Sequence, residues 1–339
     1  MEILAAEVTS SDHYSVHLNW SSSLLQFKYK LLCETERIYT VVQKIEGSIA
    51  EEDKWQIAYI GYGEHTVVMN LNPSQEYLFR IRFHRSDDNY SAWSPSTKAI
   101  TEKEPYYGEN LHDAVSQQKF QEIHDVLQSG NVKIDVPDNE GLSALMNTAR
   151  QDQTEIMKIL LSFNASVNAK DDSGKTALMH ACIHGQLAAV KILVQNGALY
   201  EDFDLGGSAP LHYAVDSCDS DLIEWMIRNG ADVNIQDKNA HWTPLMRCAS
   251  LNGNKLIALT LIRNGADIDL RDIDGKTCLM IAVINGYQKL VDVLLDNNAN
   301  IVIYNKNGHT AYELAMSLEK DSIIESLMKF MKKQKIECC

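Results

Sequence analysis

The sequence predicts a multidomain protein in which an all-β sandwich is followed by an all-α solenoid of stacked repeats. Two observations support this division. Over the first hundred residues, apolar and polar residues alternate with the period of two that is typical of strands. From about residue 109 onward, one phrase recurs at intervals of 33 or 34 residues, which is typical of a repeat architecture. At 339 residues, the chain is also long enough for two domains.

Two stretches of the first hundred residues show the alternation most clearly. In one, apolar residues are separated by His17 and Asn19; in the other, they are separated by Leu78, Arg80 and Arg82. This pattern predicts strands that bury one face. The apolar positions are Val16, Leu18 and Trp20 in the first stretch and Tyr77, Phe79, Ile81 and Phe83 in the second.

A turn precedes the second stretch. The sequence LNPSQEYLFRIRF, residues 71–83, places an Asn-Pro pair shortly before Tyr77. This arrangement predicts a tyrosine corner, in which the phenol forms a hydrogen bond to the backbone of the turn in a β-sandwich. With Trp55 and the segment SAWSPS at residues 91–96, the region resembles a fibronectin type III domain. The resemblance implies a β-sandwich over residues 1–101.

Two features of this region have a second interpretation. The segment SAWSPS is similar to half of the Trp-Ser box of cytokine receptors, but a single copy is interpreted as a strand edge. Direct DNA binding is an alternative function. It would have to use the one basic cluster of this region, which is formed by Arg80, Arg82 and Arg85. Their alternation instead predicts a solvated face of a sheet.

The charge of the chain argues against nucleic acid. The chain has 31 Lys and Arg residues and 46 Asp and Glu residues, which gives a formal net charge of −15. Residues 104–328 hold most of the excess, with 17 basic and 31 acidic residues. Because such a surface repels phosphate, no direct nucleic-acid partner is expected.

Cysteine usage and hydropathy bear on the compartment. Seven cysteines without a regular pairing pattern predict free thiols in a reducing environment. The opening MEILAAEVTSSD has no basic region of the kind that begins a secretory signal. No tract of about 18 apolar residues is present, so no membrane partner is expected. These observations predict an intracellular protein.

The repeated phrase is interpreted as one structural unit. A Gly two residues before an anchor position suits a tight turn, and a hydroxyl at the anchor suits a helix N-cap that Pro can follow. A second helical run then ends at Asn or Asn-Gly. Each unit is predicted to be helix, turn, helix and hairpin, and must stack because alone it cannot bury its apolar faces. The anchors are Glu109, Ser143, Thr176, Ala209, Thr243, Thr277 and Thr310.

Two anchors carry the most informative phrases. Residues 209–212 read Ala-Pro-Leu-His and residues 243–246 read Thr-Pro-Leu-Met, and with the period of about 33 they resemble the ankyrin repeat. The resemblance implies an array of about six to seven units over residues 109–333, with the terminal units as caps. Residues 102–108 are predicted to be a short linker and residues 334–339 a tail.

The two domains in this order, over the full length, resemble the family of fibronectin type III and ankyrin repeat domain proteins. The resemblance implies protein partners in signalling or transcriptional regulation, in the cytoplasm, the nucleus or both. Four lysines near the end precede Cys338 and Cys339. A lipid anchor is one interpretation of this tail, but Cys-Cys is not a prenylation box, and the lysines also suit a helix C-terminus.

Candidate chemistry is sparse. His180, Cys182 and His184 lie two residues apart on a predicted helix, so their side chains point in different directions and no metal site is expected. Cys182 and Cys248 occupy small-residue positions and are expected to be buried and unreactive. His212 is interpreted as a scaffold residue bonded to the backbone of the next hairpin. No cofactor or small-molecule substrate is expected.

An enzyme with a site between the domains is the other alternative function. It would need a nucleophile, a base and an orienting group. The sequence does not supply this combination, so no catalytic residues are predicted.

Partner contacts are expected at repeat positions that the fold does not require. These positions lie just before the anchor and seven or eight residues after it, on the concave surface of the solenoid. Four of these positions hold apolar residues, which suggests a contact patch. An equally weighted interpretation is that neighbouring side chains cover these apolar residues. The candidates are Leu142, Arg150, Lys175, Ile183, His184, Trp242, Leu251, Lys276 and Ile284.

The unit that contains Trp242 departs from the others. His241 replaces the turn Gly, one residue is added to the hairpin before Thr243, and another lies between the helices near residues 250–253. Such irregularity is interpreted as a hint of function. The sequence as a whole predicts a monomeric, non-enzymatic adaptor that binds one or more proteins.

Overall fold

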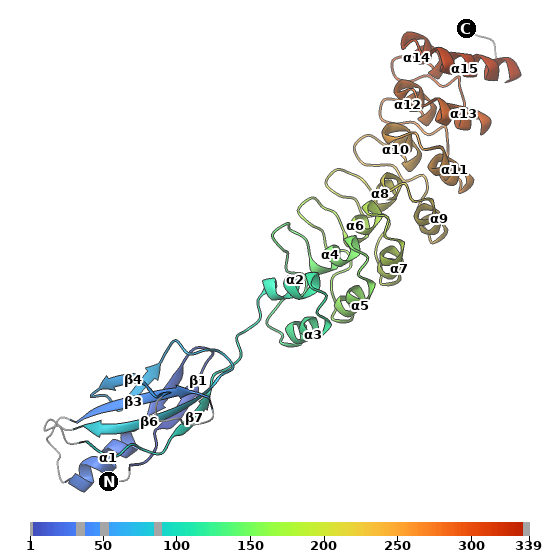
Figure 1. Cartoon of the computed structure of the whole chain (residues 1–339). Coiled ribbons are helices and arrows are strands. Elements are labelled where there is room, and N and C mark those ends of the chain that lie inside the picture. The colour runs from blue at the N-terminus through green and yellow to red at the C-terminus, as the bar shows by residue number, and fades with distance from the viewer. Residues whose placement is uncertain (1–2, 32–37, 48–53, 85–89, 335–339) are drawn as a thin grey trace. The chain divides into compact units, whose positions relative to one another are not determined.

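The computed structural model describes residues 3–31, 38–47, 54–84 and 90–334. The chain divides into two compact units, Met1–Pro105 and Tyr106–Cys339, which Figure 1 shows. Arg85, Cys338 and Cys339 lie outside the described residues, so their predicted roles are not addressed.

The first unit is an antiparallel β-sandwich, as predicted. One sheet has three strands in the order β1-β2-β5, and the other has four in the order β4-β3-β6-β7. The alternate residues of β6 that the pattern assigned to the core are all buried. The strands are β1 (Glu7–Ser11), β2 (Val16–Asn19), β3 (Tyr39–Glu46), β4 (Gln56–Gly61), β5 (His65–Val68), β6 (Glu76–His84) and β7 (Thr97–Ile100).

A helix that the alternation did not predict follows β2. Helix α1 (Ser21–Leu31) begins where the Asn19 side chain accepts a hydrogen bond from the Ser21 backbone N–H at 2.9 Å. This is the bond expected of an N-cap, and it satisfies a donor that the helix cannot use internally. Trp20 and Leu24 are buried in the sandwich core, which holds the start of the helix against it.

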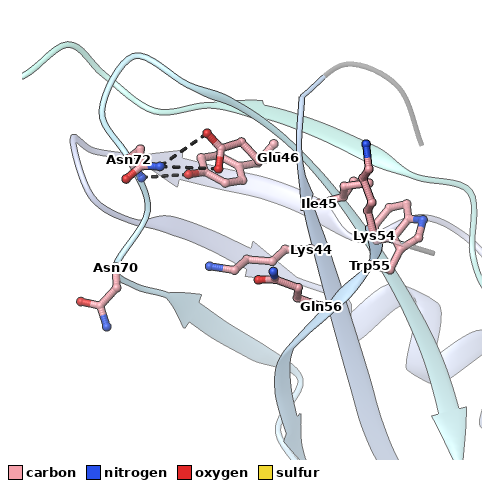
Figure 2. A pocket seen from close by; sticks show the side chains of 9 residues that line it. Lys44, Ile45, Glu46, Lys54, Trp55, Gln56, Asn70 and Asn72 are labelled. Atoms are coloured by element: carbon pink, nitrogen blue, oxygen red, sulfur yellow. Dashed lines mark hydrogen bonds between the residues drawn. The ribbon is translucent and has the colours of Figure 1, made fainter. Parts of the chain in front are cut away.

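The tyrosine corner is confirmed. The backbone N–H of Asn72 donates to the phenol oxygen of Tyr77 at 2.8 Å, and Thr101 donates to the Asn72 carbonyl at 2.7 Å. The corner borders a pocket of about 410 Å³, where Figure 2 shows Asn72 bonded to Glu46. The turn before β6 is therefore tied to strands distant in the sequence.

The expected solvated face formed by Arg80 and Arg82 is wrong. Both guanidinium groups stack on aromatic rings, and each lies within 5 Å of the Trp93 ring centroid. SAWSPS does run along the edge of β6, because Ser91 and Ser94 donate backbone bonds to Phe83 and Ile81. The sequence pattern did not predict this stacking, because the contacts between rings and cations depend on where the SAWSPS segment packs against β6.

The second unit is an ankyrin solenoid of seven helix pairs, as Figure 1 shows. Hairpins connect the pairs, and each pair packs on the next. The first helices are α2 (Gly108–Ser116), α4 (Ala144–Arg150), α6 (Ala177–Ile183), α8 (Pro210–Asp216), α10 (Pro244–Leu251), α12 (Cys278–Asn285) and α14 (Ala311–Ser317). The second helices are α3 (Phe120–Gln128), α5 (Thr154–Ser162), α7 (Leu187–Gln195), α9 (Ser220–Arg228), α11 (Lys255–Arg263), α13 (Gln288–Asp296) and α15 (Asp321–Gln334).

The predicted N-caps hold in the repeats whose anchor is a hydroxyl residue. In each, the hydroxyl accepts a hydrogen bond from the backbone N–H three residues later, as for Thr243 and Met246 at 3.2 Å. The first unit differs, because α2 is capped at Tyr107 and not at Glu109. There the Asn110 side chain accepts from the Tyr107 N–H at 2.6 Å, so the cap uses a different residue pair. The capping hydroxyl residues are Ser143, Thr176, Thr243, Thr277 and Thr310.

The fifth unit has the longer hairpin that the sequence predicts. In the neighbouring hairpin, the Asp272 N–H donates to the carbonyl of Lys276 four residues later. Here Asp237 donates to Trp242, five residues later, at 2.9 Å. His241 adopts a φ of +57°, although L-residues with a side chain avoid this left-handed region. The equivalent Gly275 has a φ of +76° without that cost.

Replacing His241 by Gly is expected to stabilise the array. Relief of the left-handed strain outweighs the added freedom of the unfolded chain, for a net gain of roughly 0.5 to 1 kcal/mol. The control Gly308→Ala, at the equivalent position with a φ of +77° and no atom within 4 Å of the added Cβ, should instead lower stability by about 1 kcal/mol, because it creates the same strain. Urea unfolding of both variants measures the two changes, and a destabilised His241→Gly would contradict this account.

Candidate partner-binding surface

The hairpins and first helices of the array form one continuous surface. From the third hairpin onward, a backbone N–H at each tip donates to a carbonyl of the preceding hairpin, at 2.8 to 3.0 Å. The tips therefore form a ladder that fixes the spacing between units. The bonded pairs, donor first, are Leu205 and Ser173, Lys238 and Gly207, Ile273 and Ala240, and Lys306 and Asp274.

Leu142 does not belong to an exposed surface, and its prediction as a contact residue is wrong. It is buried in the core of the array. Its backbone N–H donates to Asp138 at 2.9 Å, which holds the turn and leaves the apolar side chain facing the core. Ser208 at the same repeat position is also buried. Lys175 and Lys276 reach water from this position because their charged ends extend past the core.

The predicted cationic candidates are paired within the array. Arg150 lies 3.3 Å from Glu140, and Lys175 lies 3.8 Å from the buried Asp204 of the next hairpin. Lys276 lies 2.6 Å from Asp274 and 3.7 Å from Asp272. Such pairs orient the hairpins, and a partner would have to compete with them for these cations.

Trp242 lies in the joint between two units, half-buried against the core. Its indole N–H donates to Asp272 at 3.3 Å, and its carbonyl accepts from the His212 ring at 2.8 Å. Neighbouring side chains therefore cover much of the Trp242 indole, as the alternative interpretation of the apolar candidates expected. The longer hairpin directs Trp242 toward the next repeat.

Three other apolar side chains remain open. Leu251 is 49% exposed, Ile284 is 38% exposed and Leu318 is 44% exposed. They lie at the ends of α10, α12 and α14, first helices that pack side by side, and we call them the C-terminal stripe. Ile183 is half-buried, and His184 is exposed beside it, with its ring bonded to the His180 carbonyl at 2.9 Å. Leu318 was not predicted, although it stands eight residues after Thr310 just as Leu251 follows Thr243.

A polar row on the first helices was also missed. Four residues after the anchor, a side chain binds the turn Asp of its own hairpin: Asn147 binds Asp138, His180 binds Asp171 and Tyr213 binds Asp204. A recurring polar residue at this offset was the available signal. The row joins hairpin tip to helix within these three repeats.

Arg247 breaks this row in the fifth unit. Because the hairpin is longer, its guanidinium turns back to Asp216 of the preceding unit, with two bonds of 3.0 and 2.7 Å. This hydrogen-bonded pairing raises the pKa of Arg247 above its ordinary value. The bidentate pair links two repeats across their joint.

The histidines and cysteines of the array serve packing. His212 is buried, accepts from the Ala209 N–H at 3.2 Å and lies 2.8 Å from the Trp242 carbonyl, as predicted for a scaffold residue. Cys182 and Cys248 are buried, and burial raises the pKa of the Cys248 thiol to about 12. Within the described residues, no group of three His, Cys, Asp or Glu side chains is placed to hold a metal ion.

Comparison with known proteins identifies the repeats and the family. A family model of ankyrin repeats matches residues 111–204, 211–305 and 245–337. The human fibronectin type 3 and ankyrin repeat domains protein 1 is 47% identical over 277 residues, which cover 80% of this chain and 77% of that protein. The chain belongs to the family of fibronectin type 3 and ankyrin repeat domains proteins. Its mouse member is 42% identical over 279 residues, covering 81% of this chain and 78% of that protein.

A solved structure has the same fold as the array. The ankyrin repeat domain of Bcl-3 superposes with a TM-score of 0.59 at 24% identity, covering 65% of this chain and 97% of that one. This likeness shows the ankyrin fold. Membership of a family named for its two domain types supports a role in protein interaction. No helix in the described part of the chain is both long and apolar enough to cross a bilayer.

The array is expected to lose stability in mild acid. Burial lowers the pKa of His212 below its unfolded value, so the unfolded chain binds the proton first. Stability is therefore full above about pH 6.5 and falls as the pH drops from there through the folded pKa. The melting temperature should decrease between about pH 7 and about pH 5, and less steeply in His212→Gln. Equal slopes in the two proteins would exclude His212 as a source of the effect.

Proposed function

We propose that this protein is a non-enzymatic adaptor whose array binds a protein partner on its concave surface. The observation that carries the proposal is the C-terminal stripe. Leu251, Ile284 and Leu318 expose apolar surface seven or eight residues after the anchors of three successive repeats. Large apolar side chains grouped in this way are typical of contact surfaces.

The stripe is suited to a partner by its geometry and rigidity. Tyr287 donates to the Leu251 carbonyl at 3.0 Å, and Asn285 donates to the Ala249 carbonyl at 3.0 Å, so the helix ends are tied together. A pre-organised surface costs less conformational entropy on binding. Completing the burial of each side chain would contribute on the order of 1 kcal/mol, since each is already partly covered.

The finer parts of the proposal rest on the family. Intracellular signalling or transcriptional regulation, in the cytoplasm or nucleus, is the setting that we propose, with the protein as a monomer. Half-buried Trp242 would contribute at the edge of the contact, and His184 and Ile183 would extend it toward the earlier repeats. The paired cations Arg150, Lys175 and Lys276 would serve as polar rim.

The two alternatives have less support. The pocket of Figure 2 is lined by lysines, amides, aromatic rings, Ile45 and Glu46, and its described lining includes no Ser, Cys or His to act as a nucleophile or base. Direct DNA binding would depend on Arg80 and Arg82, whose guanidinium groups are stacked on rings. A chain with a net charge of −15 also repels phosphate.

The decisive test is a paired substitution, Leu251→Asp with Ile284→Asp. Both side chains are exposed, so the fold should tolerate the change with a melting temperature within about 2 °C of the wild type. Partner proteins captured from cells by the wild type should be reduced at least about tenfold, because charges replace the apolar contact.

The matched control is Leu256→Asp. Leu256 is an exposed leucine on α11, in the second-helix layer, so the same charge is added away from the stripe. Capture by this variant should equal that of the wild type. Undiminished capture by the Leu251→Asp, Ile284→Asp protein would refute the proposed surface.

A further inference from the structure

Five side chains form a single stack beside the four-stranded sheet of the sandwich. In order they are Trp55, Arg80, Trp93, Arg82 and Tyr90. The guanidinium carbon of Arg80 lies 4.2 Å from the Trp55 ring centroid and 4.6 Å from that of Trp93. That of Arg82 lies 4.5 Å from Trp93 and 4.9 Å from Tyr90. Each cation is thus held between two aromatic rings.

The stack is fixed by backbone contacts. The Ser91 hydroxyl accepts from the Phe83 N–H, and the Ser94 hydroxyl accepts from the Ile81 N–H, each at 3.0 Å. These bonds hold Trp93 over the strand that carries both arginines. The positions of the cations are therefore set before any partner arrives.

Arg82 is an unusual arginine for this chain. No carboxylate among the described residues forms an ion pair with it, and its buried Nε–H has no hydrogen-bond partner there. Arg247, which is also half-buried, instead has a bidentate pair with Asp216. Partial burial of a charge is costly unless an opposite charge compensates it, and aromatic faces supply only part of that compensation. The absence of a described carboxylate partner distinguishes Arg82 from Arg247.

Exposed apolar residues lie on the same face of the sheet. Val41 pairs with Arg82 on one side and with Ile60 on the other, and Gln43 pairs likewise with Arg80 and Ile57. Directly paired residues share a face, so each arginine is in a row with an isoleucine. Ile57 is 61% exposed and Ile60 is 58% exposed. A stack that served only the fold would not need two open isoleucines beside it.

We propose that this face, which we call the Arg–Ile face and define by Arg82, Tyr90, Ile57 and Ile60, docks an acidic segment of a partner protein. A partner carboxylate meets the edge of the Arg82 guanidinium, and an aliphatic side chain of the same segment packs on Ile60. Two strand spacings separate these residues, about 10 Å, which an extended segment covers in about three residues. The recognised pattern is therefore Asp or Glu followed or preceded, three positions away, by Ile, Leu or Val.

The alternative occupant is nucleic acid, whose phosphates also bind arginine. Charge favours the protein segment, since residues 1–103 hold 10 basic and 14 acidic residues. A phosphate backbone would meet that excess along its whole length, whereas one or two carboxylates need only the local cation. The Arg–Ile face belongs to the first unit, so this proposal can be tested independently of the C-terminal stripe, which belongs to the second unit.

The test uses the full chain and a phage-displayed library of random linear peptides. Selected peptides should be enriched in the acidic–aliphatic pattern. Their affinity should fall about tenfold in Arg82→Gln and in Ile60→Glu, since one charge contact or one apolar contact is lost. Ile60→Lys should bind more tightly than Ile60→Glu, because both variants lose the isoleucine contact but the added cation attracts the carboxylates.

Three comparisons make the result decisive. Ile60→Glu and Ile60→Lys alter the same exposed residue, so a large difference in affinity between them excludes a general loss of folding. Leu251→Asp in the array should leave peptide affinity unchanged. Peptides without acidic enrichment, equal binding by the Glu and Lys variants, or preferential Arg82-dependent binding of duplex DNA would each overturn the proposal.

Discussion

The rest of the array depends on the contact between neighbouring repeats. A single helix pair has apolar surface on two sides and no means of burying both. Stacking solves this, and hydrogen bonds between equivalent positions set the spacing. The Asn234 side chain accepts from the Asp267 N–H at 2.8 Å and donates to the Gly265 carbonyl at 3.3 Å, and Asn168 makes the corresponding bonds to Leu199 and Gly197. The polar residues of the repeated phrase therefore join adjacent units, while the apolar residues fill the space between helices.

This constraint explains how the fifth unit accommodates its added residue. The tip bonds on both sides are kept, from Lys238 to Gly207 and from Ile273 to Ala240, so the extra length is absorbed within the hairpin. Two side chains then change partners. Trp242 bonds to Asp272 of the following hairpin, and Arg247 bonds to Asp216 of the preceding helix. The irregularity that hints at function in the sequence thus strengthens both joints, and the C-terminal stripe begins in the same unit, at Leu251.

The two units treat arginine in contrasting ways. In the array, Arg247 is neutralised by a carboxylate from the preceding repeat, which makes it part of the scaffold. In the sandwich, Arg82 is held between Trp93 and Tyr90 without a described carboxylate, which leaves its charge to be met from outside. The composition of the chain does not predict the surroundings of either arginine. Their roles follow from the side chains that the fold places beside them, and only Arg82 belongs to a docking surface that we propose.

The sequence by itself determined the sandwich, the ankyrin repeats, the hydroxyl caps and the tyrosine corner, because each depends on residues close together in the chain or at one fixed period. It also located Leu251 and Ile284, since repeat positions translate directly into exposure on a regular scaffold. Only the tertiary structure decided that Leu142 is buried, that Trp242 lies in a joint, and that Arg80 and Arg82 are stacked beneath the SAWSPS loop. Those outcomes depend on contacts between side chains far apart in the chain, and a periodic pattern carries no information about which of two neighbouring groups will cover the other.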